Sequence, residues 1–150
     1  MSIHTLERKL CVSQPLHTVF DFFSRAENLE KITPPWMHFR ILTTLPVEMK
    51  KGANIEYSIR VRGIPLRWHT LIEEWSPPYR FVDVQAKGPY KLWHHTHTFE
   101  EFEGGTAIMD TVRYQLPFGP LGELVHALRV KSDVEQIFDY RSKQVPLFLL

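Results

Sequence analysis

The chain has 150 residues, of which 43% are hydrophobic and 13% aromatic, so one globular domain with a substantial core can form. The formal net charge is +1, which argues against a general nucleic-acid or anionic-membrane surface. The single cysteine, Cys11, excludes an intrachain disulfide. No stretch approaches the ~18 apolar residues of a spanning helix, and the N-terminus is too charged for a signal peptide. We therefore expect one cytoplasmic domain, residues 1–150, without nucleic-acid binding or stable membrane association.

The first part of the chain predicts one strand and two short helices. Residues 3–12 can form the strand, and Ser13 is placed to cap a helix that has Pro15 in its first turn. An apolar stripe follows at helical spacing: Leu16, Val19, Phe20 and Phe23. A second helix over 26–32 ends before Pro34 and Pro35, because a proline disfavours a helical residue before it.

From residue 37 onward the hydrophobic period becomes two, which predicts strands separated by glycine and proline turns. The expected strands cover residues 37–45, 53–61, 66–75, 80–86, 91–103 and 106–116. Gly104 and Gly105 form a hairpin signal between the last two strands. Because consecutive strands joined by short turns pair antiparallel, these segments and the first strand predict a seven-stranded antiparallel sheet.

The last element is predicted to be one amphipathic helix of roughly 25 residues. Its stripe steps by threes and fours: Leu121, Leu124, Val125, Leu128, Val134, Ile137, Phe138, Arg141 and Val145. Pro146 is expected to kink or stop this helix, and Arg141 to pair with an acidic residue inside. A curled sheet presents a concave apolar face that one helix can cover without mating fully. We therefore expect an α+β fold with a cavity between sheet and helix.

The segment from residue 93 to 99 is the most informative stretch. Its strand period of two places four side chains on one face: Trp93, His95, His97 and Phe99. The aromatic ends mark that face as buried, and buried imidazoles need hydrogen-bond partners. Alternation in the neighbouring strands places two carboxylates, Asp83 and Asp110, on the same inner surface. The sequence therefore predicts an apolar pocket that encloses a small polar cluster.

The expected ligand-binding residues all fall on this inner surface: Tyr57, Trp68, Asp83, Gln85, Trp93, His95, His97, Phe99, Asp110 and Tyr114. Trp68 and Trp93 could stack a flat or ring-shaped ligand. His95, His97 and Tyr114 could fix its polar end.

The order of elements, together with several local motifs, resembles the START-like helix-grip superfamily, also called SRPBCC. The motifs are Ile32-Thr33-Pro34-Pro35, Gly63 to Trp68, Arg80 to Asp83, Gly88-Pro89-Tyr90 with Trp93 to Phe99, Gly105-Thr106, Asp110, Tyr114 and Leu116 to Gly119. More closely, the chain is similar to bacterial ligand-binding members of the "cyclase/dehydrase" type. The resemblance implies a helix-grip fold, as in polyketide cyclases, lipid-transfer domains and plant pollen-allergen proteins. Some similar proteins are labelled sugar-nucleotide epimerases, but this chain has no glycine-rich dinucleotide loop.

Four readings of the polar cluster stay open on sequence alone. We favour binding of a small hydrophobic, aromatic or amphipathic molecule, without a cofactor, by a monomer or homodimer. A cyclase or dehydratase would use His95, His97 and Asp110 for acid–base catalysis. A third interpretation is a protein-interaction or regulatory module whose pocket is vestigial; the alternative to any cavity is a fully packed core. A strand His-x-His pair beside a carboxylate also occurs in zinc and iron sites, but we favour a hydrogen-bonded cluster and expect no metal.

Overall fold

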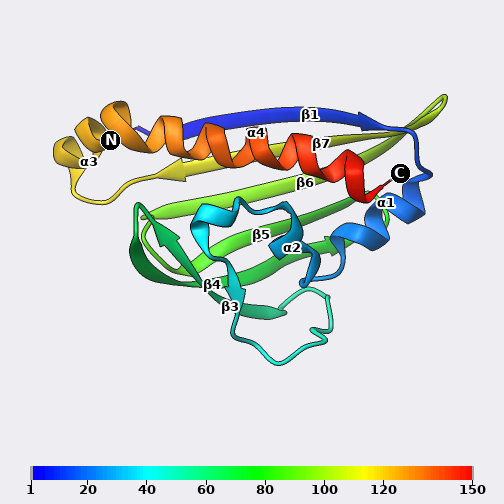
Figure 1. Ribbon diagram of the computed structural model, residues 1–150, viewed down its shortest axis with the longest axis horizontal. Coiled ribbons are helices and arrows are strands. Elements are labelled where there is room, and N and C mark those ends of the chain that lie inside the picture. The colour runs from blue at the N-terminus through cyan, green and yellow to red at the C-terminus, as the bar shows by residue number, and fades with distance from the viewer. Residues whose placement is uncertain (1, 150) are drawn as a thin grey trace.

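The computed structural model describes residues 2–149. Seven antiparallel strands lie in the order β1-β7-β6-β5-β4-β3-β2, and a C-terminal helix runs along the sheet (Figure 1). The strands are β1 (His4–Val12), β2 (Arg40–Ile41), β3 (Asn54–Val61), β4 (Ile64–Ser76), β5 (Arg80–Lys87), β6 (Leu92–Phe102) and β7 (Gly105–Gln115). The helical elements are α1 (Leu16–Phe23), α2 (Asn28–Ile32), η1 (Pro35–Met37), α3 (Gly119–Val125), η2 (His126–Val130) and α4 (Lys131–Phe148). The predicted α+β helix-grip fold is confirmed.

The inner face of the sheet follows the predicted alternation. On β6, His95, His97 and Phe99 are buried, while Thr96 and Thr98 are only partly covered. β7 pairs with β6 so that Asp110 lies opposite His97, and β5 pairs so that Asp83 lies opposite His95. The pairing register therefore brings both carboxylates beside the two imidazoles.

Apolar packing holds the helix layer on the sheet at two places. Toward the end of α4, Phe20 and Phe23 of α1 pack with Phe99 and Val145. Nearer the start of α4, Val134 and Phe138 pack on Val112 and Tyr114 of β7, together with Leu6 of β1. Among residues 2–149, no helix is long and apolar enough to cross a membrane.

Two local predictions near the N-terminal helices were wrong. Ser13 does not cap α1, whose N-cap residue is Pro15 without any side-chain hydrogen bond. The strand expected over residues 37–45 shrinks to Arg40–Ile41, because η1 occupies Pro35–Met37 and His38 adopts a left-handed backbone. A residue with positive φ interrupts extended pairing, so only two residues of this segment join β3.

The C-terminal helix differs from the predicted regular helix. It begins at Gly119, passes through the π-helical segment η2 and continues through Pro146 to Phe148. A π-helical turn inserts an extra residue, which rotates the following apolar face by about 100°. Leu121 and Leu128 therefore stand 62% and 67% exposed, although the predicted stripe placed them with the buried Val134 and Phe138.

Candidate functional site

A cavity of about 630 Å³ lies between the sheet and the helix layer. This volume falls within the range of about 300–1,000 Å³ that small-molecule sites occupy. Most of its wall is apolar or aromatic, contributed by β3, β4, β6, α4 and η1. Representative wall residues are Met37, Ile55, Ile59, Trp68, Trp93 and Ile137. The fold therefore provides a largely apolar space of the size that a small ligand needs.

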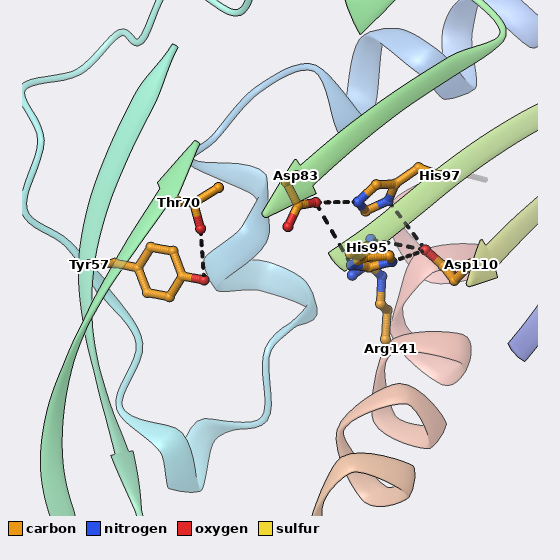
Figure 2. A network of polar contacts seen from close by, with 7 residues as sticks. All are labelled: Tyr57, Thr70, Asp83, His95, His97, Asp110 and Arg141. Carbon is orange, nitrogen blue, oxygen red and sulfur yellow. Dashed lines mark hydrogen bonds and ion pairs between the residues drawn. The ribbon is translucent and has the colours of Figure 1, made fainter. Parts of the chain in front are cut away.

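The polar part of the wall belongs to a compact cluster of two histidines, two aspartates and one arginine (Figure 2). His97 Nε2 donates to Asp83 Oδ2 at 2.5 Å, and His95 Nε2 donates to Asp110 Oδ1 at 2.7 Å. His97 Nδ1 lies 3.3 Å from Asp110 Oδ1, and the two imidazoles stack with centroids 3.6 Å apart. Arg141 reaches the cluster from α4, with Nη2 3.8 Å from Asp110 Oδ1. The predicted pairing of Arg141 with an inner acidic residue is confirmed.

The two histidines occupy different electrostatic environments. Burial and the neighbouring His97 lower the pKa of His95 to about 4. Burial would also lower the pKa of His97, but its contacts with the Asp110 and Asp83 carboxylates outweigh this and raise the pKa. The structure therefore favours a neutral His95 stacked on a protonated His97.

The carboxylates stay ionised although they are enclosed. Burial alone would raise the pKa of Asp110, but the Arg141 charge and the histidine hydrogen bonds hold that pKa well below its usual value. At Asp83 the effect of burial is likewise exceeded by His95 and His97, which lower the pKa. Two negative charges then face the positive charges of His97 and Arg141. This balance is what makes so many ionisable groups tolerable beneath a helix.

A second polar pair lies on the far side of the cavity, on strands β3 and β4. Thr70 Oγ1 donates to the Tyr57 hydroxyl at 3.4 Å, and that hydroxyl points from β3 toward the cluster (Figure 2). Burial raises the pKa of Tyr57, so its phenol stays neutral. The indole Nε1 of Trp68 is buried and has no hydrogen-bond acceptor among residues 2–149. The β3–β4 side therefore offers neutral hydrogen-bonding groups opposite a charged cluster.

Six of the ten predicted ligand-binding residues line the cavity: Tyr57, Trp68, Asp83, Trp93, His95 and His97. Asp110 is buried behind the histidines and touches them without lining the cavity. Phe99 packs in the core near α1. The Gln85 amide donates to the Tyr90 carbonyl at 2.7 Å and thereby holds the turn before β6.

Tyr114 takes part in a separate cluster near η2. Its hydroxyl lies 2.8 Å from His126 Nε2, and the His126 ring stacks on His4 with centroids 3.5 Å apart. His4 in turn lies 3.1 Å from a carboxylate oxygen of Glu123. The sequence did not indicate His126, because the π-helical turn that directs it toward Tyr114 has no readable period.

Other residues that line the cavity could not be predicted from the sequence either. Met37, Phe39 and Met49 belong to irregular segments or short elements, where no period reports which way a side chain points. Ile137 and Arg141 could be placed, because they fall on the apolar stripe of α4.

Asp83, His95 and His97 each present one ligand atom within 4.8 Å of the others, a spacing that a metal ion could bridge. In this arrangement, however, each Nε2 is directed at a carboxylate oxygen. A guanidinium also lies beside the cluster, and its charge opposes that of a cation. These contacts fit a hydrogen-bonded cluster better than a metal centre.

The curled sheet, the covering helix and the largely apolar cavity between them together define a ligand-binding helix-grip protein. A sequence profile of the family described as "Polyketide cyclase / dehydrase and lipid transport" matches residues 12–137. The chain belongs to this family, which is of the SRPBCC type. No curated protein matches the sequence.

Solved structures share the fold at low sequence identity. Ara h 8.0201 is 17% identical, with a TM-score of 0.66 over 96% of this chain and 98% of that chain. Protein Ms6760 from Mycobacterium smegmatis is 16% identical, with a TM-score of 0.71 over 99% and 96%. A nucleoside-diphosphate sugar epimerase from Corynebacterium glutamicum is 23% identical, with a TM-score of 0.70, but only 29% of that chain is covered. These likenesses establish the fold alone.

Proposed function

We propose that this protein binds a small hydrophobic or amphipathic molecule in the cavity between the sheet and α4. The observation that carries this proposal is the cavity of about 630 Å³ with an aromatic wall and one polar cluster. Apolar walls supply affinity through burial, and a few placed polar groups fix orientation. The family membership supports the same class of function.

The stacking surfaces suit a flat ligand. Trp68 and Trp93 meet edge to face, with centroids 5.2 Å apart, and Tyr57 lies nearly parallel to Trp68. Fixed aromatic rings lose little entropy when they receive a ring-shaped partner. We therefore expect ring compounds to bind better than flexible chains of the same apolar area.

The test is a fluorescence titration with N-phenylnaphthylamine, a neutral ring compound that brightens when it enters an apolar site. The wild-type chain is expected to bind one probe molecule. Ile59→Trp, which fills the cavity from β3, should abolish binding. Ile64→Trp adds the same ring at a 62% exposed position outside the cavity wall and should leave binding intact. Absence of binding by the wild type, or equal binding by both variants, would refute the proposal.

A second candidate function is a cyclase or dehydratase-like activity in the same cavity. The observation that favours it is the pairing of a neutral His95 with a His97 whose pKa is raised, since acid–base catalysis uses neighbouring groups with separated pKa values. His97→Gln removes the proton donor while keeping a polar side chain. An enzyme would lose turnover and keep its fold, whereas a carrier would keep binding N-phenylnaphthylamine.

A further inference from the structure

Arg141 lines the cavity and keeps buried hydrogen-bond donors that have no acceptor among residues 2–149. These donors are its Nε and Nη2 atoms. The guanidinium group has five N–H donors in a rigid planar fork. Buried donors without acceptors are costly, so a position that keeps them calls for a partner from outside the chain.

Asp110 balances the charge of Arg141 but does not satisfy its donors. Its Oδ1 lies 3.8 Å from Nη2, beyond hydrogen-bond distance, and already accepts from His95 at 2.7 Å. The guanidinium is flanked instead by the rings of Phe23 and Phe138, at 5.4 and 5.7 Å. These rings hold the planar group by cation–π contact, and they accept no in-plane hydrogen bonds.

The charge count around Arg141 decides between an anionic and a neutral partner. Two carboxylates, Asp83 and Asp110, face Arg141 and the histidine pair. The raised pKa of His97 favours one protonated histidine, which together with Arg141 balances the two carboxylates. An anionic ligand would add an uncompensated buried charge, whereas a carbonyl oxygen accepts hydrogen bonds without changing the balance.

We propose that the natural ligand carries a neutral carbonyl oxygen, as a ketone or an ester does, that accepts hydrogen bonds from the Arg141 guanidinium. This inference rests on the proposed function and narrows it to ring-shaped, carbonyl-bearing amphipathic molecules. The buried Trp68 Nε1, on the opposite wall, is a second donor that a further oxygen could use.

The experiment compares three naphthalenes with different groups at the same ring position, each displacing bound N-phenylnaphthylamine. Acetylnaphthalene has the carbonyl, isopropylnaphthalene has the same shape without an acceptor, and naphthoate has an anionic carboxylate. Acetylnaphthalene should bind about tenfold more tightly than isopropylnaphthalene, as expected for a hydrogen bond to a charged donor. It should also bind more tightly than naphthoate.

Arg141→Met should remove the preference for acetylnaphthalene over isopropylnaphthalene. Lys143→Met, on the exposed side of the same helix, should retain it. Trp68→Phe should weaken both compounds but keep their ratio, which distinguishes Arg141 from the Trp68 indole donor.

Equal wild-type affinities for acetylnaphthalene and isopropylnaphthalene would overturn the inference while leaving the proposed function intact. Tighter binding of naphthoate than of acetylnaphthalene would contradict the inference that the ligand group at Arg141 is a neutral carbonyl. Loss of the preference in Trp68→Phe but not in Arg141→Met would overturn the assignment to Arg141. If N-phenylnaphthylamine itself does not bind, the proposed function fails first. The affinities of the compounds for the wild-type chain are compared without any variant. This comparison therefore tests the inference even if Arg141→Met folds poorly.

Discussion

His95 and His97 are identical side chains two residues apart on β6, yet their surroundings shift their pKa values in opposite directions. Both rings are buried, and both contact the same two carboxylates. Taken together, the ring nitrogens of His97 lie closer to the two carboxylates than those of His95 do, so the positive charge is favoured on His97. A charge there disfavours protonation of the stacked His95. One strand thus presents two stacked imidazoles whose pKa values are shifted in opposite directions.

This arrangement predicts a loss of stability on acidification. The unfolded chain binds a proton at His95 near pH 6.5, whereas the folded protein does so only near pH 4. Stability from neutral His95 is therefore complete above pH 6.5 and is lost as the pH falls toward 4. The linkage amounts to about 3 kcal/mol over this window. Urea unfolding followed by circular dichroism at several pH values would measure it.

The control is a pair of glutamine variants. His95→Gln should flatten the dependence between pH 6.5 and 4, whereas His17→Gln, on the exposed face of α1, should leave it unchanged. His97 contributes in the opposite direction, because its raised pKa adds stability that is lost as the pH rises through that value. An identical pH profile for wild type and His95→Gln would contradict this account.

Individual elements position the site through close backbone contacts. The hairpin between β6 and β7 sets the register that places Asp110 opposite His97, and β1 closes against the start of β7. At that start, Thr106 Oγ1 donates to the Gln14 carbonyl at 2.8 Å, and Gly105 lies directly under the Val12 carbonyl. The absence of a side chain at Gly105 is what permits this approach.

Gly105→Ala should therefore destabilise the fold by about 2 kcal/mol or more, because its Cβ would collide with backbone atoms that cannot swing away. Gly104→Ala is the matched control at the neighbouring position. It meets no atom within 4 Å, so its cost should be limited to the strain of its positive φ, about 1 kcal/mol. Chemical unfolding of both variants would compare them, and equal losses would contradict the collision.

Other contacts join elements across the cavity. Arg62, in the turn between β3 and β4, makes a two-pronged ion pair with Asp133 of α4, at 2.7 and 3.1 Å. Both residues belong to the cavity wall. The pair is partly exposed, so its contribution to stability is small, and its effect is to hold the hairpin tip near the helix.

At the scale of the whole molecule, the protein keeps an internal space instead of a fully packed core. Tight packing around Phe20, Phe99 and Val145 anchors one end of the helix layer, while the middle of α4 spans the cavity. A ligand that enters this space binds only the folded state, because no such wall exists in the unfolded chain. Ligand binding and folding are therefore linked.

That linkage yields a prediction for the intact chain. N-phenylnaphthylamine at 100 times its dissociation constant should raise the free energy of unfolding by about 2.7 kcal/mol. Urea unfolding with and without the probe would measure the change. The cavity-filling Ile59→Trp should show no such increase, and Ile64→Trp should show the full increase. An equal increase in Ile59→Trp would place the probe outside the cavity.

A site residue could be predicted where its position follows from the periodicity of its own strand, and could not where its position depends on tertiary packing. Trp93, His95 and His97 could be assigned to an inner face because a strand has an exact period of two. Asp83 and Asp110 followed from the same rule in adjacent strands. Tyr114 obeyed the rule as well, but its hydroxyl contacts His126, which a π-helical turn brings into reach. Such a turn depends on tertiary packing and leaves no trace in hydrophobic spacing.

The sequence by itself determined the strand and helix order and the inner face of each long strand, because these follow from short-range periodicity. Only the tertiary structure decided that Asp110 lies behind the histidines, that Arg141 keeps unused donors and that an apolar space stays open between the layers. These features depend on distances between residues far apart in the chain. Periodicity fixes the face of an element on which a side chain lies, but it does not fix which residue of another element lies against that side chain.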